Sequence, residues 1–467
     1  MTSWELAGAR VRPAPAGLVL ALACAAQFMV VLDVSVVNVA LPAIQSALGF
    51  GDAGLPWVAG AYTLAFAGFL LSGGRLADLR GAGRVFTAGI ALFSVASLAG
   101  GLAADPGLLI AARAGQGLGA AVLAPATLTI LTTRFPEGPR RTRALATWTA
   151  VSLAGGAAGN LVGGALADLF SWRAILLVNV PIGAVAIVLA RRLPAGERRA
   201  GRLHLPGAAS ATAGLALLAY GLMQAGPRGW DDPVTAGALA ASVALLAAFA
   251  LVETRRAAVP LLPPRLLRLR AVSAGNAIML LTGACFQVPM WYFLTLYMQD
   301  VLQLSALRTG LGFLPHTLLT MIVGLRVTPW LMRRLDDRTL IAAGALIAAG
   351  GFLWQSTATA ASGYAGGVLG PAVLMSAGGG LLNTPLTTTV TSGVPAADAG
   401  AASGLMNTAK QAGGALGLAA LTAATAGHGG TARALAGACG HAFLIMAVTL
   451  GAVAVLSLTL PARRDAA

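Results

Sequence analysis

Long apolar stretches separated by short polar loops run from one end of the chain to the other. A helix needs about 17–25 predominantly apolar residues to cross a bilayer. Fourteen stretches are long enough, near residues 17–41, 54–73, 84–104, 107–132, 143–168, 172–190, 206–224, 234–253, 271–298, 307–332, 338–358, 365–391, 398–426 and 437–461. The pattern predicts an all-α integral membrane protein with fourteen spans.

The loops between these stretches carry an uneven charge. Of the loop arginines, 24 fall on one side of the predicted membrane, and four fall on the other side, Arg173, Arg228, Arg308 and Arg433. Cytoplasmic loops carry an excess of basic residues, so we expect both termini to be cytoplasmic. Thirty of the 31 basic residues are arginine and 60 residues are glycine, a bias typical of a GC-rich genome. We therefore expect the inner (cell) membrane of a bacterium.

The composition excludes several other classes of protein. The chain is 57% hydrophobic and 10% charged, whereas a soluble domain has about 25% charged residues. The net charge of +15 does not indicate nucleic-acid binding, because the arginines lie in short loops between spans. The three cysteines have no metal-ligand spacing, so we expect no metal site. A P-loop is absent and the four histidines form no catalytic motif, so we expect neither ATP hydrolysis nor an enzyme.

One carboxylate lies inside the first apolar run. Asp33 is the only acid in that run and lies roughly 12 Å from its outer end, and Arg113 lies roughly 9 Å from the outer end of the fourth run. A carboxylate in a span costs about 2.5–3.5 kcal/mol, so it indicates a functional residue. The alternative is a polar residue hydrogen-bonded to a neighbouring helix. We interpret Asp33 as a proton-binding group whose partner is Arg113.

A further cation, Lys410, lies near the middle of the thirteenth run. With Asp33 ionised, the charges of Asp33, Arg113 and Lys410 sum to +1, and with Asp33 protonated they sum to +2. Both sums repel a permanent cation in a medium of low dielectric. We therefore expect a neutral or anionic substrate. Lys410 either contacts that substrate or bonds backbone carbonyls of a neighbouring helix.

Glycines recur at a spacing of four residues in several runs. The motifs are Gly115-x-x-x-Gly119, Gly155-x-x-x-Gly159-x-x-x-Gly163, Gly366-x-x-x-Gly370 and Gly413-x-x-x-Gly417. Small residues at this spacing share one helix face and let two helix backbones approach closely. They indicate helices that slide against each other, with ordinary packing as the alternative.

Four stretches carry motifs of known transporters. They are Leu32-Asp33-Val34-Ser35-Val36-Val37-Asn38-Val39-Ala40-Leu41-Pro42, the loop from Gly74 to Arg84, Arg113-Ala114-Gly115-Gln116-Gly117-Leu118-Gly119-Ala120-Ala121, and the run from Gly155 to Gly164. Together they resemble the major facilitator superfamily, and within it the fourteen-span drug:proton antiporter family. Two stretches depart from the family pattern. Ala82 and Gly83 replace basic residues of the loop motif, and Asn160 replaces the proline of the fifth-span motif.

The resemblance implies the major facilitator fold, with two six-helix bundles and two extra transmembrane helices between them. The expected parts are a cytoplasmic arm at 1–16, the N-terminal bundle at 17–190, cytoplasmic linkers with two extra spans (206–224 and 234–253) at 191–270, the C-terminal bundle at 271–461 and a cytoplasmic tail at 462–467. We expect a monomer.

The resemblance also implies roles for particular residues. Proton coupling falls to Asp33 and Arg113. The side chains expected to bind substrate are Asn38, Gln116, Phe286, Gln287, Met290, Asn383 and Lys410. For those of the second bundle, packing between helices is the alternative. The residues expected to serve as conformational motifs are Gly74, Asp78, Arg84, Gly155, Gly159 and Gly163.

These observations predict a proton-coupled antiporter that exports a small hydrophobic or amphipathic compound, such as an antibiotic or a related toxin. The proton gradient supplies the energy, and no cofactor is expected. An importer or facilitator of a small metabolite on the same fold is the alternative. A membrane-embedded enzyme is the remote alternative.

Overall fold

The structure is a computed structural model that describes residues 15–51, 54–135, 139–193, 205–255, 264–391, 394, 399–426 and 431–461. Every element within these residues is a helix. The predicted N-terminal arm and C-terminal tail, and most of the linker after residue 193, lie outside the described residues. The bounds of the elements follow in chain order.

The first half of the chain forms α1 (Ala16–Leu48), α2 (Pro56–Arg80), α3 (Ala82–Gly101), α4 (Pro106–Arg134), α5 (Pro139–Leu169), α6 (Trp172–Leu177) and α7 (Asn179–Ala190). A helical hairpin of α8 (Leu205–Arg228) and α9 (Pro233–Arg255) follows. The second half forms α10 (Pro264–Arg268), α11 (Arg270–Phe286), α12 (Pro289–Leu296), η1 (Tyr297–Val301), α13 (Ala306–Ile322), η2 (Val323–Val327), α14 (Thr328–Leu331), α15 (Asp337–Ser356), η3 (Ala360–Ser362), η4 (Ala365–Leu369), α16 (Gly370–Thr391), α17 (Ala399–Ala424) and α18 (Ala432–Ser457).

Eleven helical runs among the described residues are long and apolar enough to cross a membrane. They coincide with eleven of the fourteen predicted stretches. The helices α2, α8 and α17 occupy the other three ranges but are not among the eleven, and the apolar parts of α2 and α8 are shorter, Pro56–Leu70 and Ala209–Ala225. The all-helical membrane architecture is therefore confirmed, and the count of fourteen spans stays a prediction.

Two predicted spans are interrupted in the structure. Residues 172–190 fold as α6 and α7, and residues 271–298 fold as α11, α12 and the start of η1. Pro289 begins α12, and a proline lacks the amide proton that would continue the preceding helix. In contrast, α5 runs without a break through Asn160, at the position where the family motif carries a proline.

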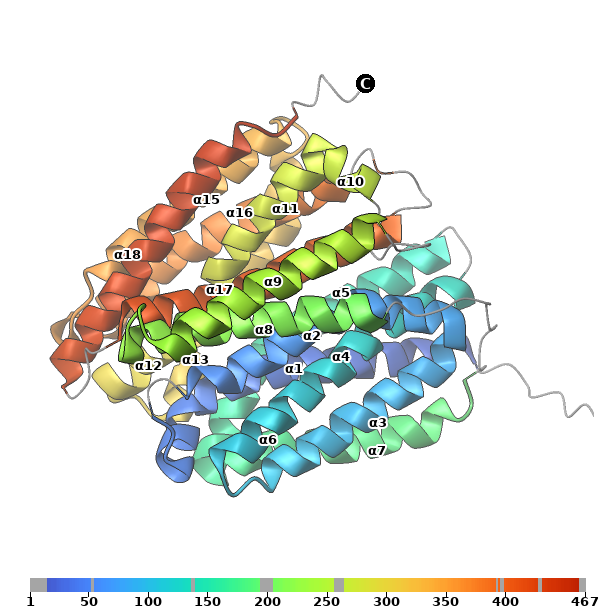
Figure 1. Cartoon of the computed structure of the whole chain (residues 1–467), viewed down its shortest axis with the longest axis horizontal. Helices are drawn as coiled ribbons and strands as arrows, with labels where there is room; N and C mark the ends of the chain where they lie inside the picture. The colour runs from blue at the N-terminus through green and yellow to red at the C-terminus, as the bar shows by residue number, and fades with distance from the viewer. Residues whose placement is uncertain are drawn as a thin grey trace, which may run out of the picture.

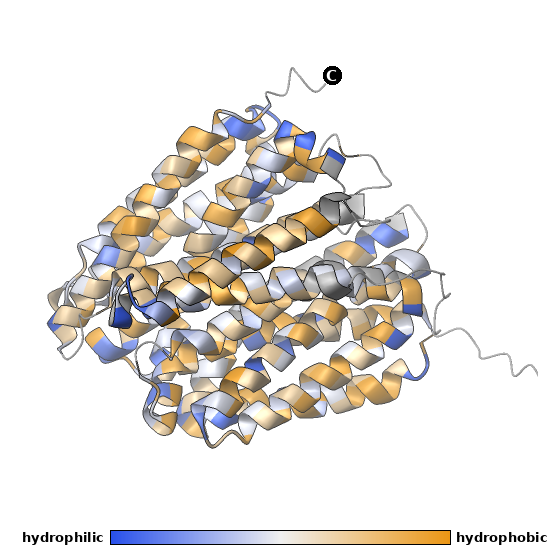
Figure 2. Cartoon of the chain, viewed as in Figure 1, coloured by the Kyte–Doolittle hydropathy of each residue, from blue (hydrophilic) through white to orange (hydrophobic). Residues whose placement is uncertain are grey.

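The helices form two bundles with a hairpin between them (Figure 1). The helices α1 to α7 gather in one half of the picture, and α11 to α18 gather in the other half. Apolar residues cover most of the length of the helices (Figure 2). We call the side on which α1 begins and α18 ends the terminal face, and the other side the opposite face.

The two bundles meet on the opposite face. Gln299 Nε2 donates a hydrogen bond of 2.7 Å to the carbonyl oxygen of Val39 in α1. Asp168, near the end of α5, accepts hydrogen bonds from the first two amides of α13, at 3.2 Å from Ala306 N and 2.9 Å from Leu307 N. A carboxylate at a helix N-terminus satisfies free amides and favours the helix dipole. The opposite-face ends of the bundles are thus bonded to each other.

The α8–α9 hairpin covers the seam between the bundles where α2 lies beside α17. Leu64 of α2, Ala219 and Met223 of α8, and Ala415 of α17 belong to one buried apolar cluster. A Cβ added to Gly68 would lie 2.0 Å from Thr212 Oγ1, so α2 and α8 approach closely at that point. The helix α8 therefore packs against both bundles, and α9 packs against α8.

Most of the motif glycines mark close approaches between helices, whereas nothing lies within 4 Å of the Cβ position of Gly366. A Cβ added to Gly155, Gly159 or Gly163 of α5 would lie within 3.2 Å of α1. The next residue, Gly164, faces another helix, because its added Cβ would lie 2.5 Å from the carbonyl oxygen of Ala306. The helix α5 is therefore packed closely between α1 of its own bundle and α13 of the other bundle. Whether these contacts slide during transport stays a prediction.

Candidate functional site: a buried ion pair in the first bundle

Asp33 lies inside the first bundle and is 0% exposed. Its Oδ2 accepts a hydrogen bond of 2.5 Å from Arg113 Nη1, so the two residues that the sequence places at similar depth form an ion pair. Its Oδ1 accepts two more hydrogen bonds of 2.8 Å, from Gln116 Nε2 and Asn179 Nδ2. Hydrogen bonds to a charged group are stronger than neutral ones. Three donors from α4 and α7 thus stabilise the carboxylate.

Arg113 is held on several sides and is only 2% exposed. Its Nε donates to the carbonyl oxygen of Val58 at 2.9 Å, and its Nη1 also donates to Gln116 Oε1 at 2.8 Å. The guanidinium lies 4.6 Å from the centre of the Tyr62 ring, within the range of a cation–π contact. The planar guanidinium group suits this set of fixed partners. A shift of Arg113 would therefore break contacts with α1, α2 and its own helix together.

The site also contains polar atoms without partners. Within the described residues, Tyr62 Oη and Asn179 Oδ1 are buried and make no hydrogen bond. Gln116 Nε2 makes a further hydrogen bond of 2.7 Å to Ser97 Oγ of α3. An unpaired buried polar atom costs about 1–3 kcal/mol. The site thus contains two polar atoms without a partner among the described residues, one in Tyr62, whose ring contacts Arg113, and one in Asn179, whose amide donates to Asp33.

The sequence reasoning did not identify Ser97, Tyr62 and Asn179 as members of this site. Asn179 begins the short segment Asn179-Val180-Pro181-Ile182-Gly183, in which an amide precedes a proline within an apolar span. A buried amide of this kind needs a hydrogen-bond partner, and Asp33 is the one acid of the first apolar run. A polar amide within an apolar span could therefore have identified Asn179 as a member of the site. Ser97 and Tyr62 carry no comparable signal.

The residues expected to bind substrate differ in how deeply their side chains are buried. Gln116 is fully buried and Met290 is 1% exposed within the apolar core, so the structure places Gln116 in the ion-pair network and Met290 in packing. Asn38 is 3% exposed and makes no hydrogen bond within the described residues. Phe286, Gln287 and Lys410 are half-buried, and Asn383 is exposed. Their contact with substrate stays a prediction.

Some of the second-bundle residues lie where α11, α16 and α17 meet. The Phe286 ring lies within 3.4 Å of the Cβ position of Gly379 in α16. Gln287 lies within 2.9 Å of the Cβ position of Gly414 in α17, one turn beyond Lys410. Among the described residues Lys410 has no hydrogen-bond or ion-pair partner. A half-buried cation is therefore free near the junction of these three helices.

The loop motif after α2 is only partly described. Gly74 faces α4, with its Cβ position 3.6 Å from Pro125 Cβ, and Arg84 is exposed at the start of α3. The Asp78 side chain lies outside the described part of the structure. The role of this motif stays a prediction.

Comparison with known proteins gives the family. The family model for the Major Facilitator Superfamily matches residues 23–418. The chain is 57% identical to the cephamycin export protein of Amycolatopsis lactamdurans, with 95% of this chain and 92% of that protein aligned. It is 42% identical to the puromycin resistance protein of Streptomyces alboniger, with 87% and 80% aligned. It is 35% identical to the tetracenomycin C resistance and export protein of Streptomyces glaucescens, with 89% and 76% aligned.

A crystal structure of the peptide transporter POT in complex with sulfate has the same fold. Its TM-score is 0.67 at 17% sequence identity, with 95% of each chain covered. A likeness at this identity concerns the fold alone, because one fold supports many functions. The family match and the close relatives carry the classification. The chain belongs to the Major Facilitator Superfamily of membrane transporters, and it is not an enzyme.

Proposed function

We propose that this transporter is a proton-coupled antiporter that exports a small amphipathic antibiotic or related toxin. The names of three relatives, which describe export or resistance, support export as the direction. The observation that carries the coupling mechanism is the ion pair of Asp33 and Arg113, buried among fixed donors. Cephamycin-type compounds are the first cargo to test, since the relative named for their export is 57% identical.

Protonation of Asp33 would change the balance of the whole network. A protonated carboxyl has an O–H that donates, so it can no longer accept from all three of Arg113, Gln116 and Asn179. Arg113 would also lose its counter-charge, and breaking a buried ion pair costs about 3–5 kcal/mol. This cost favours a different arrangement of α1 and α4 when the proton is bound. The two protonation states would thus prefer two conformations of the transporter, as alternating access requires.

Lys410 supports the proposed preference for neutral or anionic cargo. The Asp33–Arg113 pair neutralises itself inside the first bundle, whereas Lys410 has no partner of opposite charge among the described residues. A half-buried cation repels a cationic cargo and attracts a carboxylate or a carbonyl oxygen. We propose that Lys410 makes this contact. Protons and the lipid bilayer are the other proposed partners, and the transporter acts as a monomer.

We further propose that the chain crosses the membrane fourteen times with its terminal face in the cytoplasm. The 24-to-4 division of the loop arginines supports this orientation. Fusion of a reporter active only in the cytoplasm to each loop tests it. Activity is expected in the fusions at Arg134, Arg255 and Arg333 and not in those at Arg228 and Arg433. The reverse pattern would contradict the orientation.

Transport into everted membrane vesicles tests the coupling and the direction together. We expect a cephamycin to accumulate inside vesicles only when the lumen is more acidic than the outside, and a protonophore to abolish the accumulation. Equilibration without a gradient would indicate a facilitator. Accumulation only in right-side-out vesicles would indicate an importer. Vesicles without the transporter are the control.

A further inference from the structure

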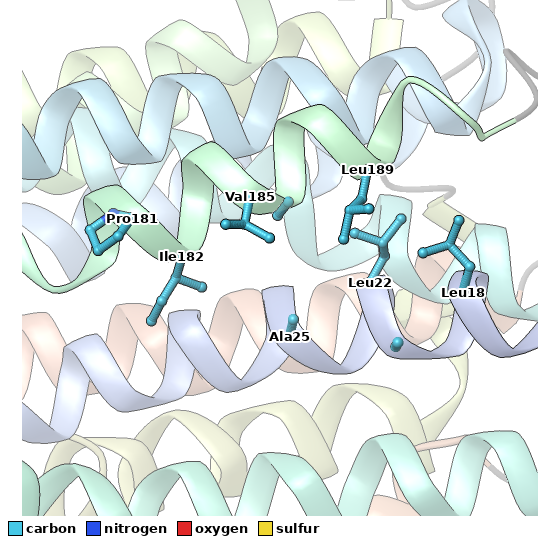
Figure 3. Close-up of a pocket in the computed structure, with 9 residues that line it drawn as sticks. Leu18, Leu22, Ala25, Pro181, Ile182, Val185 and Leu189 are labelled. Carbon is cyan, nitrogen blue, oxygen red and sulfur yellow. The ribbon is translucent and has the colours of Figure 1, made fainter.

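An apolar groove lies between α1 and α7, outside the ion-pair site (Figure 3). Leu18, Leu22 and Ala25 line it from α1, and Ile182, Val185 and Leu189 line it from α7. The groove has a volume of about 480 Å³, and all of the side chains that line it are apolar. Val185 is 61% exposed, so the groove opens on the surface of the bundle rather than into its centre. This surface faces lipid in a membrane.

The length of the groove matches one leaflet of a bilayer. Its α7 wall runs from Pro181 to Leu189, eight residue steps or about 12 Å at 1.5 Å per residue. One half of the hydrocarbon core is about 15 Å thick. Leu18 and Leu189 lie at the same end of the groove, the end at the terminal face (Figure 3). The groove therefore extends from that face almost to the middle of the membrane.

Two arginines follow the end of α7, on the terminal-face side of the groove. Arg191 and Arg192 directly follow α7, two and three residues beyond Leu189, and both are exposed. Neither has an ion-pair partner within the described residues. Both residues follow the end of α7 at the terminal face, where a membrane span meets the headgroup region. Arginine side chains at this level bind phosphate strongly.

We propose that this groove binds an anionic phospholipid, with one acyl chain along α1 and α7 and the phosphate at Arg191 and Arg192. The apolar lining excludes a cargo that needs polar anchors, since nothing in the groove can satisfy a buried hydrogen-bonding group. The paired charges at the mouth favour an anionic over a zwitterionic headgroup. Neither the transport proposal nor the ion pair depends on this site.

Native mass spectrometry of the purified transporter tests the headgroup contact. Delipidated protein is titrated with phosphatidylglycerol or with phosphatidylcholine of the same chain length. We expect the double variant Arg191→Gln/Arg192→Gln to bind the anionic lipid about tenfold more weakly and to bind phosphatidylcholine as before. The double variant Arg140→Gln/Arg333→Gln, which removes two exposed arginines elsewhere on the terminal face, is the matched control. Equal losses in both double variants would overturn the proposal.

A photoactivatable phosphatidylglycerol with the reactive group on its acyl chain tests the groove itself. We expect cross-links within residues 16–25 and 181–189, and a loss of at least fivefold in the double variant Ala21→Leu/Ala25→Leu, whose added side chains fill the groove. Ala248→Leu, at an exposed alanine of α9, is the control and should leave the cross-links unchanged. Cross-links confined to other helices would overturn the proposal. If the double variant Ala21→Leu/Ala25→Leu does not fold, the positions of the cross-links in the wild-type protein still test the proposal.

Discussion

The two bundles use the same packing but hold different chemistry. In the first bundle, Gly159 and Gly163 of α5 lie so close to α1 that an added Cβ would be 2.6 Å and 2.8 Å from its atoms. In the second bundle, Gly413 and Gly417 of α17 lie equally close to α11, at 2.1 Å and 2.5 Å. The helix pairs correspond in chain order, as the repeats of a transporter do. The repeated feature is therefore the close approach of backbones.

The charges are not repeated. The first bundle buries an ion pair whose carboxylate accepts three hydrogen bonds, whereas in the second bundle Lys410 has no ion-pair partner among the described residues. The Asp33–Arg113 pair has no net charge, so we expect it to stay intact until a proton binds. Because Lys410 lacks such a partner in the part of the chain that the structure describes, it is available to bind a ligand. This difference is the basis of our proposal that one bundle couples to protons and the other recognises the cargo. Each prediction below tests this division.

The largest effect is expected for Asp33→Asn. The amide has nearly the shape of the carboxyl group but cannot take up and release a proton. Uphill export in everted vesicles should fall by at least 100-fold, while the protein still inserts in the membrane. The double variant Asp33→Asn/Arg113→Gln removes the unpaired charge and should recover thermal stability without recovering export. Export against a gradient by either variant would place the coupling outside this bundle.

Asp33 and Arg113 should also be strongly coupled in stability. Each single variant leaves one buried charge uncompensated, so Asp33→Asn and Arg113→Gln should each lower the free energy of unfolding by about 3–5 kcal/mol. The double variant should cost much less than the sum of the two single variants. Thermal unfolding in detergent over the double-mutant cycle measures this interaction. Additive effects would mean that the ion pair does not stabilise the first bundle.

Because both bundles have glycines at close helix contacts, we expect an added methyl group at such a glycine to destabilise either bundle. Gly159→Ala and Gly417→Ala should each lower the free energy of unfolding by about 1–3 kcal/mol, because the added Cβ has no space. Gly451→Ala is the control, since no atom lies within 4 Å of its Cβ position, and alanine favours a helix by about 1 kcal/mol over glycine. A cost in only one bundle would show that the two helix pairs are not equivalent.

The smallest effect is expected at Lys410. Lys410→Gln should raise the KM for an anionic cargo about three- to tenfold and leave proton coupling and thermal stability unchanged. Resistance tests with matched cationic, neutral and anionic compounds check the charge preference. Strong protection against quaternary ammonium dyes, undiminished in Lys410→Ala, would contradict the preference for neutral or anionic cargo.

The sequence predicts the depth of a residue in the membrane better than the direction in which it points. Counting residues from the span ends puts Asp33 and Arg113 at similar heights, and the structure joins them. Counting does not fix the rotation of a helix about its axis, because the spans of this protein are apolar on every side. Gln116 was expected to bind substrate, and the structure buries it beside Asp33. Met290 points into the core for the same reason.

Contacts between helices that are far apart in the sequence depend even more strongly on how each helix is rotated about its axis. Asn179 and Asp33 are separated by 146 positions and meet only after α1 and α7 have packed together. The groove between these helices also forms only when they pack together. In the sequence, the residues that line it cannot be distinguished from other apolar residues of the spans. The breaks at Val178 and Pro289 were also absent from the predicted spans, although proline marks the second one.

The complete burial of Asp33 has a consequence for the cell when no cargo is present. A coupling carboxylate that water could reach from both faces at once would let protons cross in exchange for nothing, and would discharge the membrane even at rest. In the described arrangement the Asp33 side chain has no contact with solvent, and three donors occupy its oxygens. Proton entry must wait for movement of the helices around it. On the proposed coupling through Asp33, the described conformation therefore offers no open path for protons, however many copies the membrane holds.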